Sequence, residues 1–160
     1  MPDLMAIYLN DHLAGATMGM ELARRMADSH PSGDDAARLR QLAHDVAEDR
    51  AALIGVMERL GVSVDQVKAA MGWLGEKLAR WKLNGYLFSR SPLSTVIELE
   101  AMRLGVEGKA AGWRTLRAVA DHDERLDAAD LDRLIERAAA QVEILEALRV
   151  SATRRVFVDK

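Results

Sequence analysis

Turn signals lie far apart in this sequence of 160 residues, and this spacing limits the possible folds more than any other feature. The stretches at 29–33 and 121–125 each interrupt an apolar pattern of helical period, and Asn84 and Gly85 mark another turn. The segments between such signals run for roughly 25 residues, which is typical of long helices. No segment shows the alternation of apolar and polar residues that is typical of a strand. The sequence therefore predicts an all-α protein.

Five helical segments are expected, and the connections between them predict the topology. Their expected bounds are 3–27, 34–60, 63–83, 91–120 and 127 to beyond 148. The two short turns join antiparallel neighbours, whereas the connection between the second and fourth segments spans about 30 residues and contains a helix of its own. A connection of that length can run the full height of a bundle. We therefore expect one domain, residues 1–160, in which two helical hairpins are joined by one long helical crossover.

Composition excludes several classes of protein. The formal net charge is −3, from 22 basic and 25 acidic residues, so bulk charge does not favour nucleic acid or a membrane surface as a partner. The chain contains no cysteine, which excludes disulfides and thiolate metal sites. The first residues meet Asp3 without a basic run and do not resemble a signal peptide, and no apolar run has the length of a membrane span. A cytoplasmic protein is expected.

Polar side chains interrupt the apolar stripe that we expect on each long helix. They are Asp11 on the first, Asp49 on the second with Asp45 beside it, Glu100 and Glu107 on the fourth, and Gln141 on the fifth. Counted from the turns, all but Glu100 and Asp45 fall at one height to within about one helical turn. We therefore expect Asp11, Asp49, Glu107 and Gln141 to face one another near the middle of the bundle. His12, about 100° around the helix from Asp11, is expected on a solvated or interfacial face.

Buried carboxylates require partners, because an isolated buried charge is costly. One kind of partner is arginine, which would give a buried ion-pair network. The arginines available for it are Arg50, Arg103 and Arg114. If Arg103 or Arg114 pairs with Asp49 and Glu107, the network would fix the register of an otherwise apolar bundle.

The other kind of partner is a metal ion, iron or manganese. Its ligands would be Asp11, Asp49 and Glu107, with Gln141 as a weak oxygen donor and Asp45 or Glu48 in support. The ion-pair network is favoured over this site, because histidine ligands are missing from the set and a glutamine replaces one acid. His44 and Glu48 share a helix face and could hold an ion together, although a surface pair is the favoured interpretation.

In its helix count and lengths, its crossover and its inward acids, the chain resembles the ferritin-like superfamily, including bacterial members without an assigned role. The resemblance covers nearly the whole chain and implies a ferritin-like four-helix bundle. Metal-binding members would show Glu-x-x-His on the second and last helices, where this chain has Gln41-Leu42-Ala43-His44 and Gln141-Val142-Glu143-Ile144. Because these motifs are degenerate, the resemblance does not imply ferroxidase or oxygenase activity.

These observations predict a non-catalytic, metal-free bundle with a structural or interaction role and no cofactor. The alternative is a carboxylate-bridged iron or manganese protein for storage or redox work. A homodimer is expected through the aromatic residues of the crossover, which are Trp73, Trp81, Tyr86 and Phe88. These aromatics alternate with basic residues such as Lys77, a pattern that can bind single-stranded nucleic acid, but docking of the crossover on the bundle is favoured.

Overall fold

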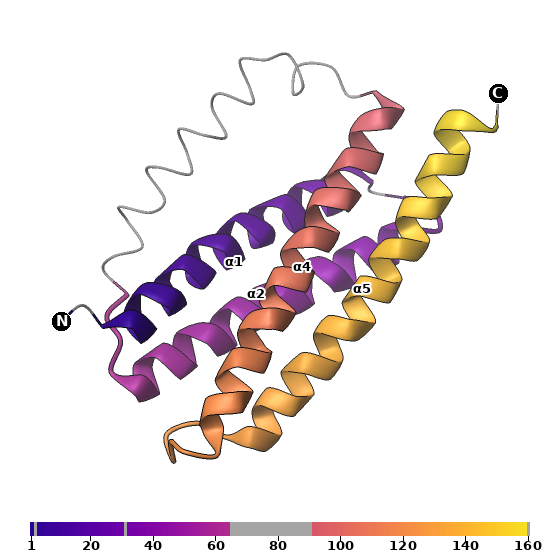
Figure 1. Ribbon diagram of the computed structural model, residues 1–160. Helices are drawn as coiled ribbons and strands as arrows, with labels where there is room; N and C mark the ends of the chain where they lie inside the picture. The colour runs from indigo at the N-terminus through magenta and orange to yellow at the C-terminus, as the bar shows by residue number, and fades with distance from the viewer. Residues whose placement is uncertain (2, 31, 65–90, 160) are drawn as a thin grey trace.

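The structure, a computed structural model, describes residues 1, 3–30, 32–64 and 91–159 (Figure 1). Within these ranges the regular structure is α-helical and contains no strand, which confirms the predicted all-α class. The helices are α1 (Leu4–Ser29), α2 (Ala36–Leu60), α4 (Pro92–Ala120) and α5 (Ala128–Phe157). Their bounds lie close to those expected from the turn signals. The helix expected at 63–83 lies almost wholly outside the described residues.

Local capping explains where the helices begin and end. The side chain of Asp3 accepts hydrogen bonds from the Met5 and Ala6 amides at 3.0 and 3.1 Å, and Asp127 caps α5 in the same way. Pro92 occupies the first turn of α4, where its missing N–H costs nothing. Gly61 ends α2 in the left-handed conformation, with φ at 72°, which glycine adopts without strain.

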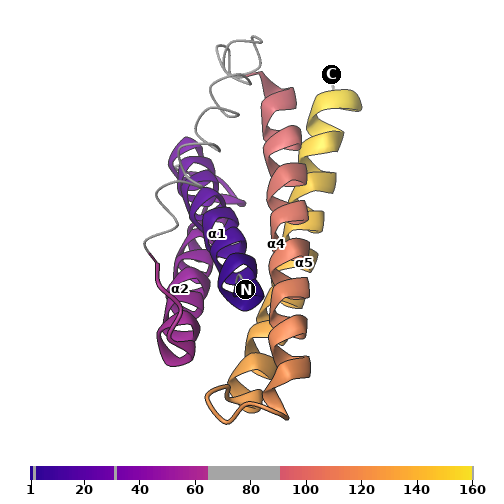
Figure 2. The same ribbon diagram turned by 60° about the vertical axis from the view of Figure 1, so that its left-hand side comes forward.

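The helices form two antiparallel hairpins, α1 with α2 and α4 with α5, which pack against each other (Figures 1 and 2). Among the four described helices, each contacts two others: α1 lies against α2 and α4, and α5 lies against α4 and α2. The end of α2 meets the turn between α4 and α5, where the Arg125 guanidinium donates to the Leu60 carbonyl at 3.3 Å. The α2 and α4 helices therefore run in the same direction.

Two apolar clusters form the core. One contains Val46, Val106 and Ala138, and the other contains Leu53 and Trp113. Along α2 and α4 the clusters follow each other, so the residues between Val46 and Leu53 and between Val106 and Trp113 lie where the clusters meet. None of the helices in the described ranges combines the length and the apolar character that crossing a membrane requires.

The inward faces of α1 and α4 differ from those expected. The stripe of α1 that contains Asp11 also contains Leu4, which is 75% exposed, and the stripe of α4 that contains Glu107 also contains Leu104, which is 70% exposed. The buried stripes instead follow Leu9 and Leu13 on α1 and Val106 and its neighbours on α4. Both helices carry two apolar stripes, and the partner helices cover the stripe that does not contain Asp11 on α1 or Glu107 on α4. On α2 and α5 the expected stripes are largely buried.

Candidate functional site

Asp49 lies at the centre of a polar layer between the two core clusters, with 2% of its surface exposed. It is buried because it continues the apolar stripe of α2, seven residues before Val56 and three after Val46. Its Oδ1 accepts a hydrogen bond from the Arg137 guanidinium. Its Oδ2 accepts from the Lys109 ammonium and from the Gln141 amide, the latter at 2.9 Å. Three helices thus meet at one carboxylate.

The two cations of this layer reach it from opposite sides, Lys109 from α4 and Arg137 from α5. Their side chains are 15% and 32% exposed, so their stems cover apolar surface while part of each remains accessible to water. Lys109 also donates to the Gln141 Oε1, and Arg137 also donates to Glu48 at 3.1 Å. Burial lowers the pKa of Lys109, and the charge and hydrogen bond of Asp49 oppose that shift. We call Asp49, Lys109, Arg137 and Gln141 the ion-pair layer.

The structure brings together only part of the expected polar cluster. Asp49 and Gln141 are hydrogen-bonded to each other inside the bundle. Asp45 is half-buried on α2 and accepts a hydrogen bond from Gln41 at 2.8 Å. Its charge acts on Lys109 but it makes no hydrogen bond to the layer in the described part of the chain.

Three other expected members lie elsewhere. Asp11 and Glu107 are exposed, because they belong to the outer stripes of α1 and α4. Arg103 pairs with Glu146 at 3.5 Å, away from Asp49. The expectation that Asp11 and Glu107 are buried inside the bundle and that Arg103 pairs with Asp49 is therefore wrong. A cation-paired acid nevertheless occupies the middle of the bundle.

The other two candidate arginines make no hydrogen bond or ion pair with Asp49 in the described part of the chain. Arg114 is exposed, and Arg50 donates from Nε to the Thr17 hydroxyl at 2.9 Å. The residue of α1 that is buried beside Asp11 is Asn10, whose amide donates to the Ala6 and Ser63 carbonyls at 2.8 and 3.2 Å. The hydrogen bond to Ser63 holds α1 to the segment that follows α2.

Lys109 and Arg137 were missed by the sequence reasoning, although Arg137 carried a usable signal. It precedes Gln141 by four residues and therefore shares its helix face. Lys109 lies between buried Val106 and buried Ala110. Its inward position could be predicted only if the stripe of α4 that contains Val106 was taken as the buried one.

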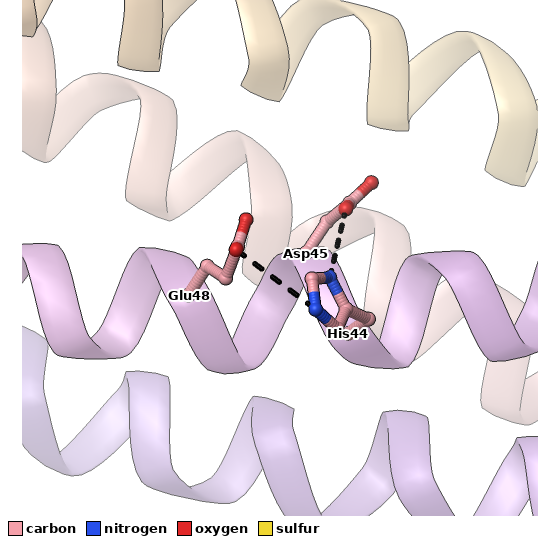
Figure 3. Close-up of side chains that lie close together, drawn as sticks. All are labelled: His44, Asp45 and Glu48. Atoms are coloured by element: carbon pink, nitrogen blue, oxygen red, sulfur yellow. Dashed lines mark ion pairs between the residues drawn. The ribbon is translucent and has the colours of Figure 1, made fainter.

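His44, Asp45 and Glu48 form a second polar group on the outer side of α2 (Figure 3). One possible ligand atom from each lies within 4.8 Å of the others, and His44 is 3.6 Å from Asp45 and 3.9 Å from Glu48. The His44 side chain is 65% exposed, and the two carboxylates already accept hydrogen bonds, from Gln41 and from Arg137. A cation at this group would compete with these bonds and with water, so the arrangement is typical of a surface ion pair.

Comparison of the chain with protein-family models, with curated proteins and with solved structures finds no match.

Proposed function

We propose that this chain is a ferritin-like helical bundle that works without metal and without catalysing a reaction, in a structural or interaction role. The observation that supports this proposal is the set of donors around Asp49. Lys109, Arg137 and Gln141 together use both of its carboxylate oxygens. A metal ion would compete with these hydrogen bonds for the same two oxygens and would lie beside two cations. An acid satisfied in this way fixes the register of three helices in the bundle.

The alternative, an iron or manganese site, receives less support from the geometry. Its proposed carboxylates were Asp11, Asp49 and Glu107, of which only Asp49 is buried. Carboxylates that share a metal ion must project into one space, as they do in the di-iron bundles. Gln141, the proposed fourth ligand, directs its oxygen to Lys109 instead.

Metal content tests the proposal directly. The protein, purified without chelator or affinity metal, would be offered iron(II) and manganese(II) anaerobically, desalted and measured by elemental mass spectrometry. We expect no stoichiometric metal, because the cations of the ion-pair layer already neutralise Asp49.

One or two ions per chain that disappear in Asp49→Asn would contradict the metal-free proposal. The matched control is His44→Ala, which removes the outer group of α2 and leaves the ion-pair layer intact. Metal lost only in this control would belong to the surface group and not to the centre of the bundle.

The interaction role includes a homodimer. The crossover aromatics expected to form its contact, Trp73, Trp81, Tyr86 and Phe88, lie outside the described residues. Within them, α4 carries an outer apolar stripe of Leu93, Ile97 and Leu104, which are 43%, 37% and 70% exposed. The exposure of this stripe to water costs free energy, and a second copy of the chain would bury it.

The cytoplasmic location stays a prediction.

Oligomeric state checks the homodimer. Light scattering after size exclusion should give twice the mass of the chain, and Leu104→Glu should give the monomer mass, because a buried charge without a partner opposes association. The control is Arg114→Glu, an exposed change on the same helix that lies off the stripe. A monomer in the wild-type protein, or a dimer unaffected by Leu104→Glu, would remove the α4 stripe from the proposal.

A further inference from the structure

A cavity of about 260 Å³ lies between α1 and α4, the two helices seen side by side in Figure 2, and residues of α2 complete its lining. Its apolar lining includes Leu9, Leu53 and Leu116. It reaches the surface, because two of its lining glycines, Gly15 and Gly108, are exposed. An enclosed apolar cavity of about 150 Å³ can hold benzene, so this space is large enough for one ring with a short side chain.

Glycines form much of the wall of this cavity. They are Gly15 and Gly19 on α1 and Gly105, Gly108 and Gly112 on α4. A Cβ built on Gly15, Gly105 or Gly108 would have no atom within 4 Å, and none of these three has a positive φ. Neither backbone conformation nor close helix packing therefore requires glycine there. Each lowers helix stability by about 0.5–1 kcal/mol relative to alanine. Their effect is to leave the space open.

Two side chains that line the cavity carry hydrogen-bonding groups without a partner in the described part of the chain. Trp113 lines it and is 2% exposed, and its indole N–H has no acceptor in the described part of the chain. A buried indole N–H normally finds a partner. His12 lines the cavity as well, half-buried against Gly112, and its ring nitrogens make no hydrogen bond within the described ranges. Burial lowers the pKa of His12, which favours the neutral ring.

The cavity lining holds as many acids as cations, so the preference for an anionic ligand rests on the unused donors of Arg50. Two cations, Arg50 and Lys109, and two acids, Asp11 and Asp49, line it. Asp49 is already paired with two cations, whereas Arg50 contacts only the Thr17 hydroxyl and no carboxylate among the described residues. The Arg50 guanidinium therefore has N–H donors left for a carboxylate.

We propose that the cavity between α1 and α4 binds a small carboxylic acid with an apolar body of about one ring. The carboxylate pairs with Arg50, and the apolar body lies along the glycine wall over the leucine side chains. Such a site matches the usual composition of ligand pockets, which are mostly apolar with a few convergent polar groups. This binding activity goes beyond the structural role proposed above and does not depend on it.

Binding is tested with three probes that share one apolar body: 3-phenylpropanoate, 3-phenylpropan-1-ol and 3-phenylpropan-1-amine. The readout is the indole N–H signal of Trp113 in ¹H–¹⁵N spectra of the full chain, assigned with Trp113→Phe. We expect saturable shifts with the acid at about tenfold lower concentration than with the alcohol, because a charge-assisted hydrogen bond is lost in the alcohol. The amine should bind weakest, because it places a cation beside Arg50.

Two variants decide whether the probe occupies this cavity. Gly108→Leu should fill it and abolish the shifts, and Arg50→Gln should reduce the affinity for the acid to that for the alcohol. Gly55→Ala is the matched control, since Gly55 is a helical glycine outside the lining, and it should bind as the wild type does. The proposal is overturned if no probe shifts Trp113, if the amine binds as tightly as the acid, or if Arg50→Gln leaves the preference for the acid unchanged. The Arg50→Gln result decides even if Gly108→Leu fails to fold.

Discussion

Replacing Asp49 with alanine is expected to lower the free energy of unfolding by about 3 kcal/mol. The change leaves the charges of Lys109 and Arg137 without their acidic partner inside the bundle. It also removes the acceptor of the Gln141 amide. The expected loss lies at the lower end for a broken buried ion pair, because Arg137 is one-third exposed and its guanidinium can turn toward water. Urea unfolding followed by circular dichroism measures it.

The control for this prediction is Asp45→Ala, one helical turn earlier on α2. Asp45 is half-buried and accepts a hydrogen bond from Gln41 on its own helix, so we expect a change of less than about 1 kcal/mol. Asp49→Asn should fall between the two variants, since the amide keeps one acceptor oxygen but loses the charge. Equal losses from Asp45→Ala and Asp49→Ala would mean that the ion-pair layer does not hold the helices together.

The sequence was sufficient to predict the four described helices, because their ends depend on local chemistry. Asp3 and Asp127 cap their helices with their own side chains, and Gly61 ends α2 by a conformation that other residues avoid. Asp49 and Gln141 were also predictable as inward residues, since α2 and α5 each carry one clear apolar stripe that both residues continue.

The inward faces of α1 and α4 could not be chosen from the sequence. Leu4 and Leu104 are larger than many of the residues that are in fact buried, such as Ala14 and Ala110. Periodicity identifies both stripes on such a helix, but only the positions of the neighbouring helices decide which one is covered. The error placed Asp11 and Glu107 inside. It also hid Lys109, which continues the stripe that is buried, three residues after Val106 and four before Trp113, and whose side chain reaches Asp49.

The cavity between α1 and α4 could not be predicted for a related reason. Its glycines are scattered over two helices, at positions 15 and 19 and at positions 105, 108 and 112. Only the fold brings them to the same space. Trp113 likewise continues an apolar stripe, and nothing in the sequence indicates that its indole N–H lacks an acceptor.

Replacing Gly15, Gly105 and Gly108 together with alanine is expected to stabilise the protein by about 2 kcal/mol. Each Cβ enters open space, and each substitution reduces the conformational entropy that the unfolded chain loses on folding. For a domain of this size the midpoint of thermal unfolding should rise by roughly 4–8 °C. Differential scanning calorimetry measures the shift.

Gly112→Ala provides the control, because its Cβ does not enter open space. Its Cβ would lie 2.9 Å from Cε1 of the His12 ring, which itself packs edge-on against Tyr8, so we expect this variant to gain less stability or to lose some. If all four substitutions stabilised the protein equally, the His12 ring would be able to move away from the new Cβ at position 112. If the triple variant were destabilised, the three glycines would serve packing. A stabilised triple variant instead means that these glycines cost the wild-type fold stability, which is expected where the space they leave has a use.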